Sequence, residues 1–344
     1  MRGVPLTHAS AFVPFVGFLS EMGIAVDPLL ANAGLSAAAL SEPDSLIPVH
    51  QMCAFLDKAA RTEGLDQMGF LVGQRTSFLT LGSLGRRLGC CFSLHEALLT
   101  TVRLHPAYAS DARLRLVAEG DRLWLQRTQD RRLERERGWQ EIEQFNVMLA
   151  IQIVRLTSHR EWRPREVRLQ ARRGAGLEKF EALADARIRF EQPYTSIEIP
   201  GALLPEPLAV TRCGVLARDK LEQELYRTAP AADFTTSVRQ VVGTFLRDGY
   251  RSVQQTASAV GMSLRTFQRR LAESDVNYSR IVEEERFRVA AELITQSRLS
   301  VTDVAMELGY ADSTNFAHAF HRWTGLSPSQ YRRHEVGSAH PCPR

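Results

Sequence analysis

The segment Ser252–Leu271, SVQQTASAVGMSLRTFQRRL, decides the fold of the C-terminal part of this 344-residue chain. Ser252 and Gln255 have the spacing of a capping box, in which each side chain bonds a free backbone N–H at the start of a helix. Gly261 suits the left-handed conformation that ends a helix, and Ser263 can cap the next one. The segment therefore predicts a short helix, a glycine turn and a second helix.

The second helix of this segment has one apolar face and one polar face. Leu264, Phe267 and Leu271 recur at the helical period and are predicted to face inward. The side chains predicted to face outward are Arg265, Thr266, Gln268, Arg269 and Arg270. Arginine can bond the edge of guanine in bidentate fashion and glutamine the edge of adenine, so the pattern is typical of a DNA-binding helix-turn-helix.

The same pattern recurs in the segment 300–323, SVTDVAMELGYADSTNFAHAFHRW. Its first four residues again have capping-box spacing. Gly309, which lies 48 residues after Gly261, is expected to end the first helix, and Asp312 or Ser313 to cap the second. The residues predicted to face inward are Phe316, Phe320 and Trp323, and those predicted to face outward are Thr314, Asn315, His318 and Arg322.

A continuous helix is predicted between the two units, from Asn277 to Ser297. A helix of this length spans about 30 Å, which is close to the roughly 34 Å of one turn of B-DNA. The connecting helix could therefore hold two recognition helices in successive major grooves. The acidic run Glu283-Glu284-Glu285 is expected to form a solvated face that points away from DNA, because it would repel phosphate.

Residues 1–228 mix helical and strand patterns, which predicts an α+β fold. Helices are predicted at Ala11–Met22, Asp27–Ala33, Val49–Thr62, Leu94–Leu104 and Trp139–Leu156. The fourth of these is opened by Ser93 and Glu96, again with capping-box spacing. Alternation on both sides of Glu119-Gly120-Asp121 predicts a hairpin. Short strands are predicted at Val167–Leu169, Ile188–Phe190 and Ile197–Ile199.

Proline and small residues in the segment Thr228–Asp233 interrupt the helical patterns on both sides and predict a linker. No strand pattern follows it. We therefore expect two domains: an α+β domain at 1–228 and an all-α domain at 229–344, with helix-turn-helix units at 252–272 and 300–323.

The overall charge does not identify a DNA-binding half. The chain has 43 basic and 39 acidic residues, and Lys58, Lys179 and Lys220 are its only lysines, so 40 of the basic residues are arginine. The excess is +2 on each side of the linker. DNA binding is therefore indicated by where a few arginines lie and not by how many there are.

Composition excludes other classes of protein. No apolar run approaches the roughly 20 residues of a membrane helix. The five cysteines are odd in number and form no CxxC pair, so we expect a cytoplasmic protein with free thiols, without a zinc site or a disulfide framework.

At these motifs the chain resembles a known family. The strings ASAVGMSLRTFQRRL and VAMELGYADSTNFAHAFHRWTGLSPSQYRR make its last 110 or so residues similar to AraC/XylS-type transcription regulators. Residues 1–205 resemble the arabinose-binding N-terminal domain of part of this family, through VDPLLANAGL, IPVHQMCAFLDKAA and SLGRRLGCCFSLHEALLTTVRLHP. The resemblance implies a ligand-sensing and dimerisation domain joined to a DNA-binding domain, most often in an activator. It does not establish arabinose as the ligand.

The resemblance also implies roles for individual side chains. The implied base-reading residues are Arg265, Thr266, Gln268 and Arg269 in the first unit and Ser313, Thr314, Asn315 and His318 in the second. The implied phosphate contacts are Ser263, Arg270 and Arg322. His318 stands where arginine is frequent, so the second helix is expected to read bases more weakly. Asp275 stands where glycine is usual, and aspartate tolerates the left-handed conformation better than most residues.

The implied partners are promoter DNA, RNA polymerase, an unknown small-molecule effector and a second copy of the chain, with no cofactor, metal or membrane. Two alternatives stay open: an enzyme pocket in the N-terminal domain, and an architectural DNA binder without a ligand. The first lacks a catalytic motif, since Gly82-Ser83-Leu84-Gly85 does not have the spacing of a nucleophile elbow and His105 is expected in a loop. The second is disfavoured by the small charge of the C-terminal domain.

Overall fold

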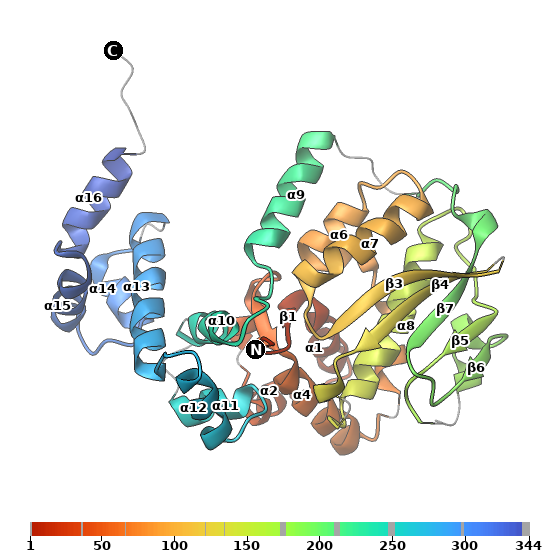
Figure 1. Ribbon diagram of the computed structural model, residues 1–344, viewed down its shortest axis with the longest axis horizontal. Coiled ribbons are helices and arrows are strands. Elements are labelled where there is room, and N and C mark those ends of the chain that lie inside the picture. The colour runs from red at the N-terminus through yellow and green to blue at the C-terminus, as the bar shows by residue number, and fades with distance from the viewer. Residues whose placement is uncertain are drawn as a thin grey trace, which may run out of the picture. The chain divides into compact units, whose positions relative to one another are not determined.

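The computed structural model describes residues 2–35, 37–65, 67–120, 122–133, 135–172, 177–209, 214–246, 252–296 and 299–338 (Figure 1). The chain forms two compact units. One comprises Val4–Pro230, and the other comprises the chain from Ala231 onward together with the first three residues. The division falls within the segment Thr228–Asp233. None of the described helices is both long enough and apolar enough to cross a membrane.

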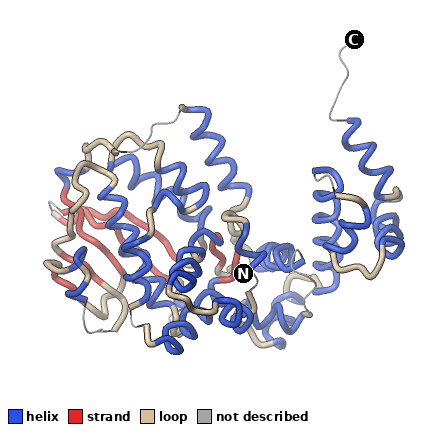
Figure 2. The backbone as a smooth tube through the Cα atoms, turned by 180° about the vertical axis from the view of Figure 1, so that it is seen from behind, coloured by secondary structure: helices blue, strands red, loops and turns tan. Residues whose placement is uncertain are grey.

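The unit Val4–Pro230 combines helices with two sheets, as Figure 2 shows by the red strands, which all belong to this unit. Its elements are β1 (Leu6–His8), α1 (Val13–Glu21), α2 (Val26–Ala33), α3 (Ala37–Ser41), β2 (Leu46–Pro48), α4 (Val49–Glu63), α5 (Met68–Arg75), α6 (Gly82–Leu88), α7 (Leu94–Tyr108), β3 (Ala112–Glu119), β4 (Arg122–Gln129), α8 (Trp139–Arg155), β5 (Glu166–Arg168), β6 (Arg187–Arg189), β7 (Thr195–Pro200) and α9 (Val215–Arg227). The predicted α+β fold is confirmed.

The larger sheet has the strand order β3-β4-β7-β5-β6. Neighbouring strands of this sheet pair antiparallel, except that β5 and β6 are parallel. The register places Leu125 of β4 opposite Leu116 on one side and Ile197 on the other. Leu125 and Ile197 are buried in the same core as the apolar stripe of α8, which covers this face of the sheet (Figure 1).

Helices α5 and α8 pack in direct contact because α5 carries glycines where they meet. A Cβ atom on Gly69 would lie 2.1 Å from the carbonyl oxygen of Glu141, and one on Gly73 would lie 2.5 Å from the Cβ of Met148. The backbone N–H of Gly69 also donates to the Glu141 carboxylate at 2.6 Å. This close approach fixes the position of α8, whose other side faces the sheet.

The elements predicted from periodicity are present, with shifted ends. The hairpin forms as β3 and β4, although Asp121 of its turn lies outside the described residues. Helix α7 continues past the predicted end to Tyr108 and contains Pro106, so the expectation that His105 lies in a loop is wrong. The capping box at Ser93 forms only in part: Ser93 accepts from the N–H of Glu96, but the Glu96 carboxylate accepts from the N–H of Phe92.

The second unit is entirely helical in its described residues. Its elements are α10 (Phe234–Leu246), α11 (Val253–Ala259), α12 (Leu264–Ala272), α13 (Tyr278–Gln296), α14 (Val301–Glu307), α15 (Ser313–Thr324) and α16 (Pro328–Ser338). Helix α13 is the predicted connecting helix, and Ser297, the predicted last residue, lies outside the described residues. The predicted all-α fold of this part is confirmed.

Each helix-turn-helix of this unit has its own buried aromatic centre. Phe267 of α12 contacts Phe234 and Tyr278, with ring centroids 5.8 and 6.1 Å away. Phe320 of α15 lies among four other aromatic rings, at centroid distances of 5.3 to 6.2 Å. These rings are Phe287, Phe316, Trp323 and Tyr331. The inward residues predicted for α12 and α15 therefore form the core.

The cysteines depart from the expected pattern of free thiols. Cys53 and Cys91 are free and buried, and burial raises the pKa of both thiols. Cys90, in contrast, is disulfide-bonded, so the expectation is wrong for this residue. Cys213 and Cys342 lie outside the described residues.

Candidate DNA-reading surface and effector cavity

Helices α11 and α12 form the first predicted helix-turn-helix. The capping box is complete, because Ser252 Oγ accepts from the N–H of Gln255 at 3.2 Å and Gln255 Oε1 accepts from the N–H of Ser252 at 2.9 Å. Gly261 has φ +70° in the turn. Ser263 then caps α12 by accepting from the N–H of Thr266 at 3.3 Å. The backbone of this unit is therefore as its sequence predicts.

The outer face of α12 carries side chains that can bond bases. Arg265, Gln268 and Arg269 are exposed, and Thr266 is half-buried. Arg269 forms an ion pair of 2.5 Å with Glu273, one turn further along the helix. Such an exposed pair contributes little stability, so Arg269 can exchange Glu273 for another partner at small cost.

Arg270 does not lie on this outer face, and the expectation that it points outward is wrong. Its guanidinium lies over the ring of Phe234, 4.0 Å from the centroid. It donates to the carbonyl oxygen of Arg2 at 2.8 Å and to the sulfur of Met262 at 3.8 Å. Arg270 thus holds the beginning of the chain against this unit.

Helices α14 and α15 repeat the arrangement. Ser300 and Asp303 form a complete capping box, and Gly309 has φ +76°. Of the two candidate caps of α15, the structure uses Asp312, which accepts from the N–H of Asn315 at 2.7 Å. Asp275, at the end of the first unit, has the expected positive φ of +53°, which confirms that aspartate replaces glycine there.

The outer face of α15 is less basic than that of α12. Thr314, Asn315 and His318 are exposed and Ser313 is half-buried. The amide of Asn315 donates to the carboxylate of Asp312 at 2.7 Å. Arg322 is exposed and lies 3.5 Å from the Glu283 carboxylate on α13. Most of the hydrogen-bonding groups on this face are therefore uncharged or already paired.

The acidic run on α13 is only in part the solvated face that the sequence predicts. Glu283 is exposed and accepts from the indole N–H of Trp323 at 3.1 Å. Glu284 is half-buried and is bonded by Arg239 and Arg280. Glu285 is buried and accepts from Arg288 at 2.7 Å, so the prediction is wrong for this residue. Glu283 thus bonds a residue of α15, and Glu284 bonds a residue of α10.

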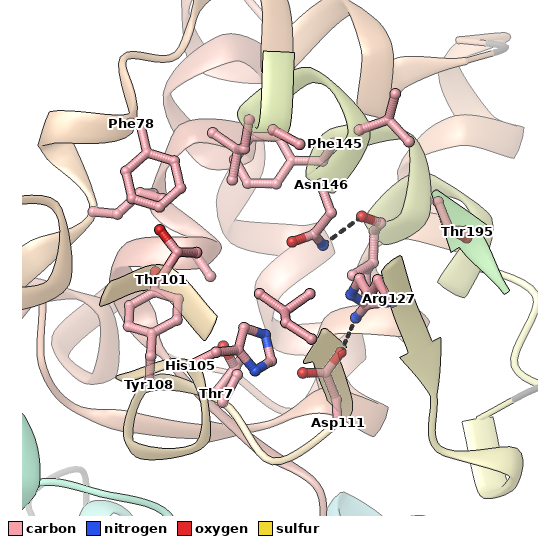
Figure 3. Close-up of a pocket in the computed structure, with 18 of the residues that line it drawn as sticks. Thr7, Phe78, Thr101, His105, Tyr108, Asp111, Arg127, Phe145, Asn146 and Thr195 are labelled. Carbon is pink, nitrogen blue, oxygen red and sulfur yellow. Dashed lines mark hydrogen bonds and ion pairs between the residues drawn. The ribbon is translucent and has the colours of Figure 1, made fainter. Parts of the chain in front are cut away.

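The unit Val4–Pro230 encloses a cavity between the larger sheet and helices α4, α6, α7 and α8 (Figure 3). Its volume is about 80 Å³, which is room for a small organic molecule. The lining residues are Thr7, Ala11, Val49, Met52, Phe78, Leu81, Leu84, Thr101, His105, Tyr108, Ala109, Asp111, Leu114, Leu125, Arg127, Ile142, Phe145, Asn146, Val147, Leu149, Ala150, Ile153, Thr195, Ser196 and Ile197. A largely apolar, concave space with a few polar groups is typical of a small-molecule site.

The charged end of the cavity is a buried ion pair. Arg127 of β4 donates to the Asp111 carboxylate and to the side-chain oxygen of Gln129. His105 of α7 lies close enough to interact electrostatically with both partners of the pair. Burial lowers the pKa of His105 to about 4, so its ring is neutral at neutral pH. Figure 3 shows Phe78 and Phe145 on the other side of the cavity from Asp111.

Helix α9 is bound to two of the helices that line the cavity. The Glu222 carboxylate accepts two bonds from Arg103 of α7, at 2.6 and 2.7 Å, and one from Arg87 of α6, at 2.8 Å. These bonds, those from Arg103 first, lower the pKa of Glu222. Arg218 pairs with Glu96 of α7 at 3.1 Å. The helix that precedes the linker is therefore held by the wall of the cavity.

Ser83, at the start of α6, has a structural role. It is fully buried, and its hydroxyl donates to the Asp44 carboxylate at 2.7 Å. A nucleophile must be accessible to its substrate, and Ser83 has no exposed surface. This arrangement ties α6 to the loop before β2.

Comparison with known proteins agrees with these two units. Residues 23–208 match the family profile described as the arabinose-binding domain of AraC transcription regulator, and residues 256–334 match that of a helix-turn-helix domain. The chain belongs to the AraC family of transcription regulators. As the helix-turn-helix profile and the named relatives agree, it is a DNA-binding regulator of transcription.

Several AraC-family proteins are similar along much or part of the chain. The ornithine utilization regulator of Pseudomonas aeruginosa is 24% identical over 341 residues, which is 96% of each chain. The regulator VirS of Mycobacterium tuberculosis is 31% identical over 150 residues, or 42% of this chain and 43% of VirS. The crystal structure of CdpR from Pseudomonas aeruginosa aligns over 94% of this chain and 98% of its own, with 21% identity and a TM-score of 0.43.

The cavity and α9 were not predicted from the sequence. One signal for the cavity was present: Leu123, Leu125 and Arg127 alternate along one strand, so Arg127 is a charge at an inward position of an otherwise apolar face. Such a charge is buried only with a partner. Helix α9 gave a weaker signal, because Leu225 is its only buried side chain among the described residues.

Proposed function

We propose that this AraC-family regulator reads promoter DNA with α12 and α15 and adjusts its activity to an effector that binds in the cavity of the other unit. The observation that carries the DNA-reading part is the outer face of α12. Arg265, Gln268 and Arg269 are exposed together on this face, and their donors and acceptors fit guanine and adenine edges. We assign Thr266 to the same surface.

Arg269→Ala tests this assignment. We expect the affinity for the cognate promoter to fall by about 1–3 kcal/mol, as for the loss of a bidentate base contact, with little change on unrelated DNA. Arg61→Ala is the matched control, because Arg61 is 61% exposed against 63% for Arg269 and also pairs with a carboxylate four residues away. A promoter footprint identical to that of the unaltered protein would remove Arg269 from the base-reading residues.

For the second helix we propose that Ser313, Thr314, Asn315 and His318 contact the bases. Ser263 and Arg322 are proposed to contact phosphates. Arg322 would leave Glu283 to do so, which costs little for an exposed pair 3.5 Å apart.

Arg270 is a different case. Its donors already bond the carbonyl of Arg2 and the sulfur of Met262, so we now propose a structural role for it in place of a phosphate contact.

We also propose that the DNA-binding function resides in the chain from residue 229 onward. A fragment 229–344 is expected to fold and to bind the promoter, because the helix-turn-helix cores are built from residues of this part. It lacks Arg2 and Gly3, so it should lose the bond that Arg270 makes to Arg2 and the bond from the N–H of Gly3 to the carbonyl of Ala232. A fragment without cooperative unfolding would contradict the proposed boundary.

The effector part of the proposal rests on the contacts of α9. Leu84 of α6 and Thr101 of α7 line the cavity, and Glu222 bonds both of these helices. We infer that an effector changes how α6 and α7 hold α9, which leads into the linker. A ligand can shift such an equilibrium only if it binds the two states differently.

Glu222→Gln tests this coupling in cells. The amide cannot accept the same charged bonds from Arg87 and Arg103, so transcription from a reporter promoter should change by about fivefold or more. Glu181→Gln is the control, because Glu181 is an exposed carboxylate that also pairs with an arginine, Arg163. Equal reporter output from the wild-type and Glu222→Gln proteins would argue against α9 as the connection.

We further propose a homodimer that acts on RNA polymerase at promoters, in the cytoplasm. Exposed apolar side chains on and beside α7 and α9 support the dimer: Phe92, Leu99 and Tyr226 are each about half exposed. Leu99→Glu should then give monomers in sedimentation, whereas Met22→Glu should not, although both residues are 48% exposed. A monomeric unaltered protein at all concentrations would contradict the dimer.

A further inference from the structure

The chemistry of the effector can be read from the walls of the cavity. Phe78, Leu84 of α6, and Phe145 and Ile153 of α8 contribute apolar surface to the cavity. Figure 3 shows Phe78 and Phe145 among them. A hydroxyl buried against such a surface without a hydrogen bond costs about 1–3 kcal/mol in proteins. A molecule that fits this space must therefore be apolar over most of its surface.

Several polar side chains of the lining have already formed their bonds within the protein. The hydroxyl of Thr101 donates to the carbonyl of Ala97 at 2.8 Å, and that of Tyr108 bonds the hydroxyl of Ser10 at 3.1 Å. The hydroxyl of Thr195 donates to the Glu143 carboxylate. A sugar needs a partner for each of several hydroxyl groups, and each of these three side chains already forms a hydrogen bond within the protein.

Three buried polar atoms of the lining have no partner in the part of the chain that the structure describes. They are Nε of Arg127, Nδ1 of His105 and Oγ of Ser196, in residues that are only 5%, 7% and 1% exposed. An unpaired buried polar atom is costly, and a ligand with a hydrogen-bonding oxygen at one of these atoms would relieve part of that cost. Arg127 and His105 belong to the charged end of the cavity.

This end has no positive charge to spare for an anion. The charge of Arg127 is balanced by Asp111, with which it forms a buried ion pair. His105 is neutral there, because burial depresses its pKa. Glu143, a further buried carboxyl group, lies near Arg127. A ligand carboxylate would therefore enter without a counter-charge, and a buried charge without a partner is strongly unfavourable.

We infer that the cavity takes an uncharged, mainly apolar molecule with few hydrogen-bonding groups, placed at the unpartnered atoms of Arg127, His105 and Ser196, and not a sugar or a carboxylate. This inference rests on the proposed effector role of the cavity. It goes further than that role because it specifies the chemical class of the effector.

Titration calorimetry on the full chain tests the inference with compounds of one size. The probes are 2-heptanone, heptanoate, heptylamine and L-arabinose. We expect 2-heptanone to bind at least about tenfold more tightly than the two charged compounds, a difference of about 1.4 kcal/mol. L-arabinose is expected not to bind.

A cavity-filling variant locates the binding. Ala150 of α8 lines the cavity, so Ala150→Leu should lower the affinity for 2-heptanone about tenfold or more. Ala184→Leu is the matched control, because it makes the same change at an exposed residue outside the cavity. Arg127→Lys keeps the charge opposite Asp111 but removes Nε, and should lower the affinity for 2-heptanone about threefold to tenfold. Circular dichroism establishes that each variant is folded.

The outcomes separate this inference from the proposed function. Tighter binding of heptanoate, heptylamine or L-arabinose that Ala150→Leu abolishes would overturn the chemical class and leave the cavity as the effector site. Binding of 2-heptanone that Ala150→Leu does not weaken would place it elsewhere and overturn the inference. Failure of all four compounds to bind would overturn the effector role of the cavity as well.

Discussion

The two helix-turn-helix units share a backbone plan and differ in the chemistry of their outer faces. Helices α11 and α14 each begin with a complete capping box, and each is followed by a glycine with positive φ. Yet α12 exposes Arg265, Gln268 and Arg269, whereas α15 exposes one arginine, Arg322, beside a threonine, an asparagine and two histidines. The helix ends are set by local hydrogen bonds, and the outer faces can diverge because they take no part in the core.

The charges at the start and end of the second recognition helix extend this difference. The α15 helix begins at the carboxylate of Asp312, whereas α12 begins at the neutral hydroxyl of Ser263. Arg322, near the end of α15, is paired with Glu283; on α12 Arg269 is paired with Glu273, and Arg265 adds a second exposed arginine. We therefore expect the first unit to supply most of the electrostatic attraction to DNA, and the second to contribute mainly position and shape.

The largest expected effect concerns the cores of the two helix-turn-helix units. Phe320→Ala should lower the free energy of unfolding of α14 to α16 by about 3–5 kcal/mol, because it removes a fully buried ring from the aromatic cluster. Phe267→Ala should do the same to α11 and α12. Hydrogen exchange measured for each helix would show the two losses separately. If each variant lowered the protection from hydrogen exchange equally in both helix-turn-helix units, the two units would form a single cooperative core.

The next effect compares the two recognition helices on DNA. Arg265→Ala should lower the promoter affinity by about 1–3 kcal/mol, and His318→Ala should lower it by less. Fluorescence anisotropy with the same promoter at several salt concentrations gives both values and the number of ionic contacts that each variant loses. A larger loss for His318→Ala would reverse the comparison.

A smaller effect is expected from the charge of Asp312. Asp312→Asn keeps a good N-cap oxygen but removes a carboxylate from the N-terminus of α15. The promoter affinity should rise about twofold to fivefold at low salt, because the repulsion of phosphate is removed, and the gain should fade as salt screens it. Asp57→Asn on α4 serves as the control. Unchanged affinity would indicate that this end of α15 lies away from the DNA backbone.

The smallest effect is a difference in acid sensitivity. The capping box of α14 uses the carboxylate of Asp303, whose pKa is lowered by its bonds to Ser300, whereas that of α11 uses the uncharged amide of Gln255. Since the folded pKa of Asp303 lies below the unfolded one, its stabilisation is present above about pH 4 and is lost as the pH falls through the folded value.

Acid should therefore increase hydrogen exchange in the first turn of α14 and leave α11 unchanged. Asp303→Asn should remove the pH dependence of α14. Equal fraying of the two helices on acidification would show that the capping carboxylate has no part in it.

Features that depend on residues close in sequence could be predicted best. The capping boxes of α11 and α14 and the left-handed positions Gly261, Asp275 and Gly309 were predicted correctly, because they depend on neighbours within a few positions. The orientation of Arg270 was predicted wrongly, because its partner is the carbonyl of Arg2, 268 positions away. Glu285 was placed on a solvated face for the same reason, because helices distant in sequence cover it.

The same difference separates the DNA-reading residues, which could be predicted, from the residues of the cavity, which could not. Those of the recognition helices could be named from the helical period, because a helix whose inward residues are known presents the others to solvent. The residues of the effector cavity could not be named in this way. Its polar end combines Asp111 and Arg127, which are 16 positions apart, with His105 from the preceding helix. Only the inward position of Arg127 gave a hint in the sequence.

The sequence by itself determined the α+β and all-α parts, the repeated helix-turn-helix and the face of each recognition helix that is free to meet DNA. These depend on the periods and end signals of single helices, which short-range interactions set. Tertiary structure alone decided which arginines are free, that α9 is bound to the wall of a cavity, and that this cavity is apolar with a neutral ion pair at one end. Those properties depend on which distant side chains pack together, and so on the burial and charge balance of the assembled core.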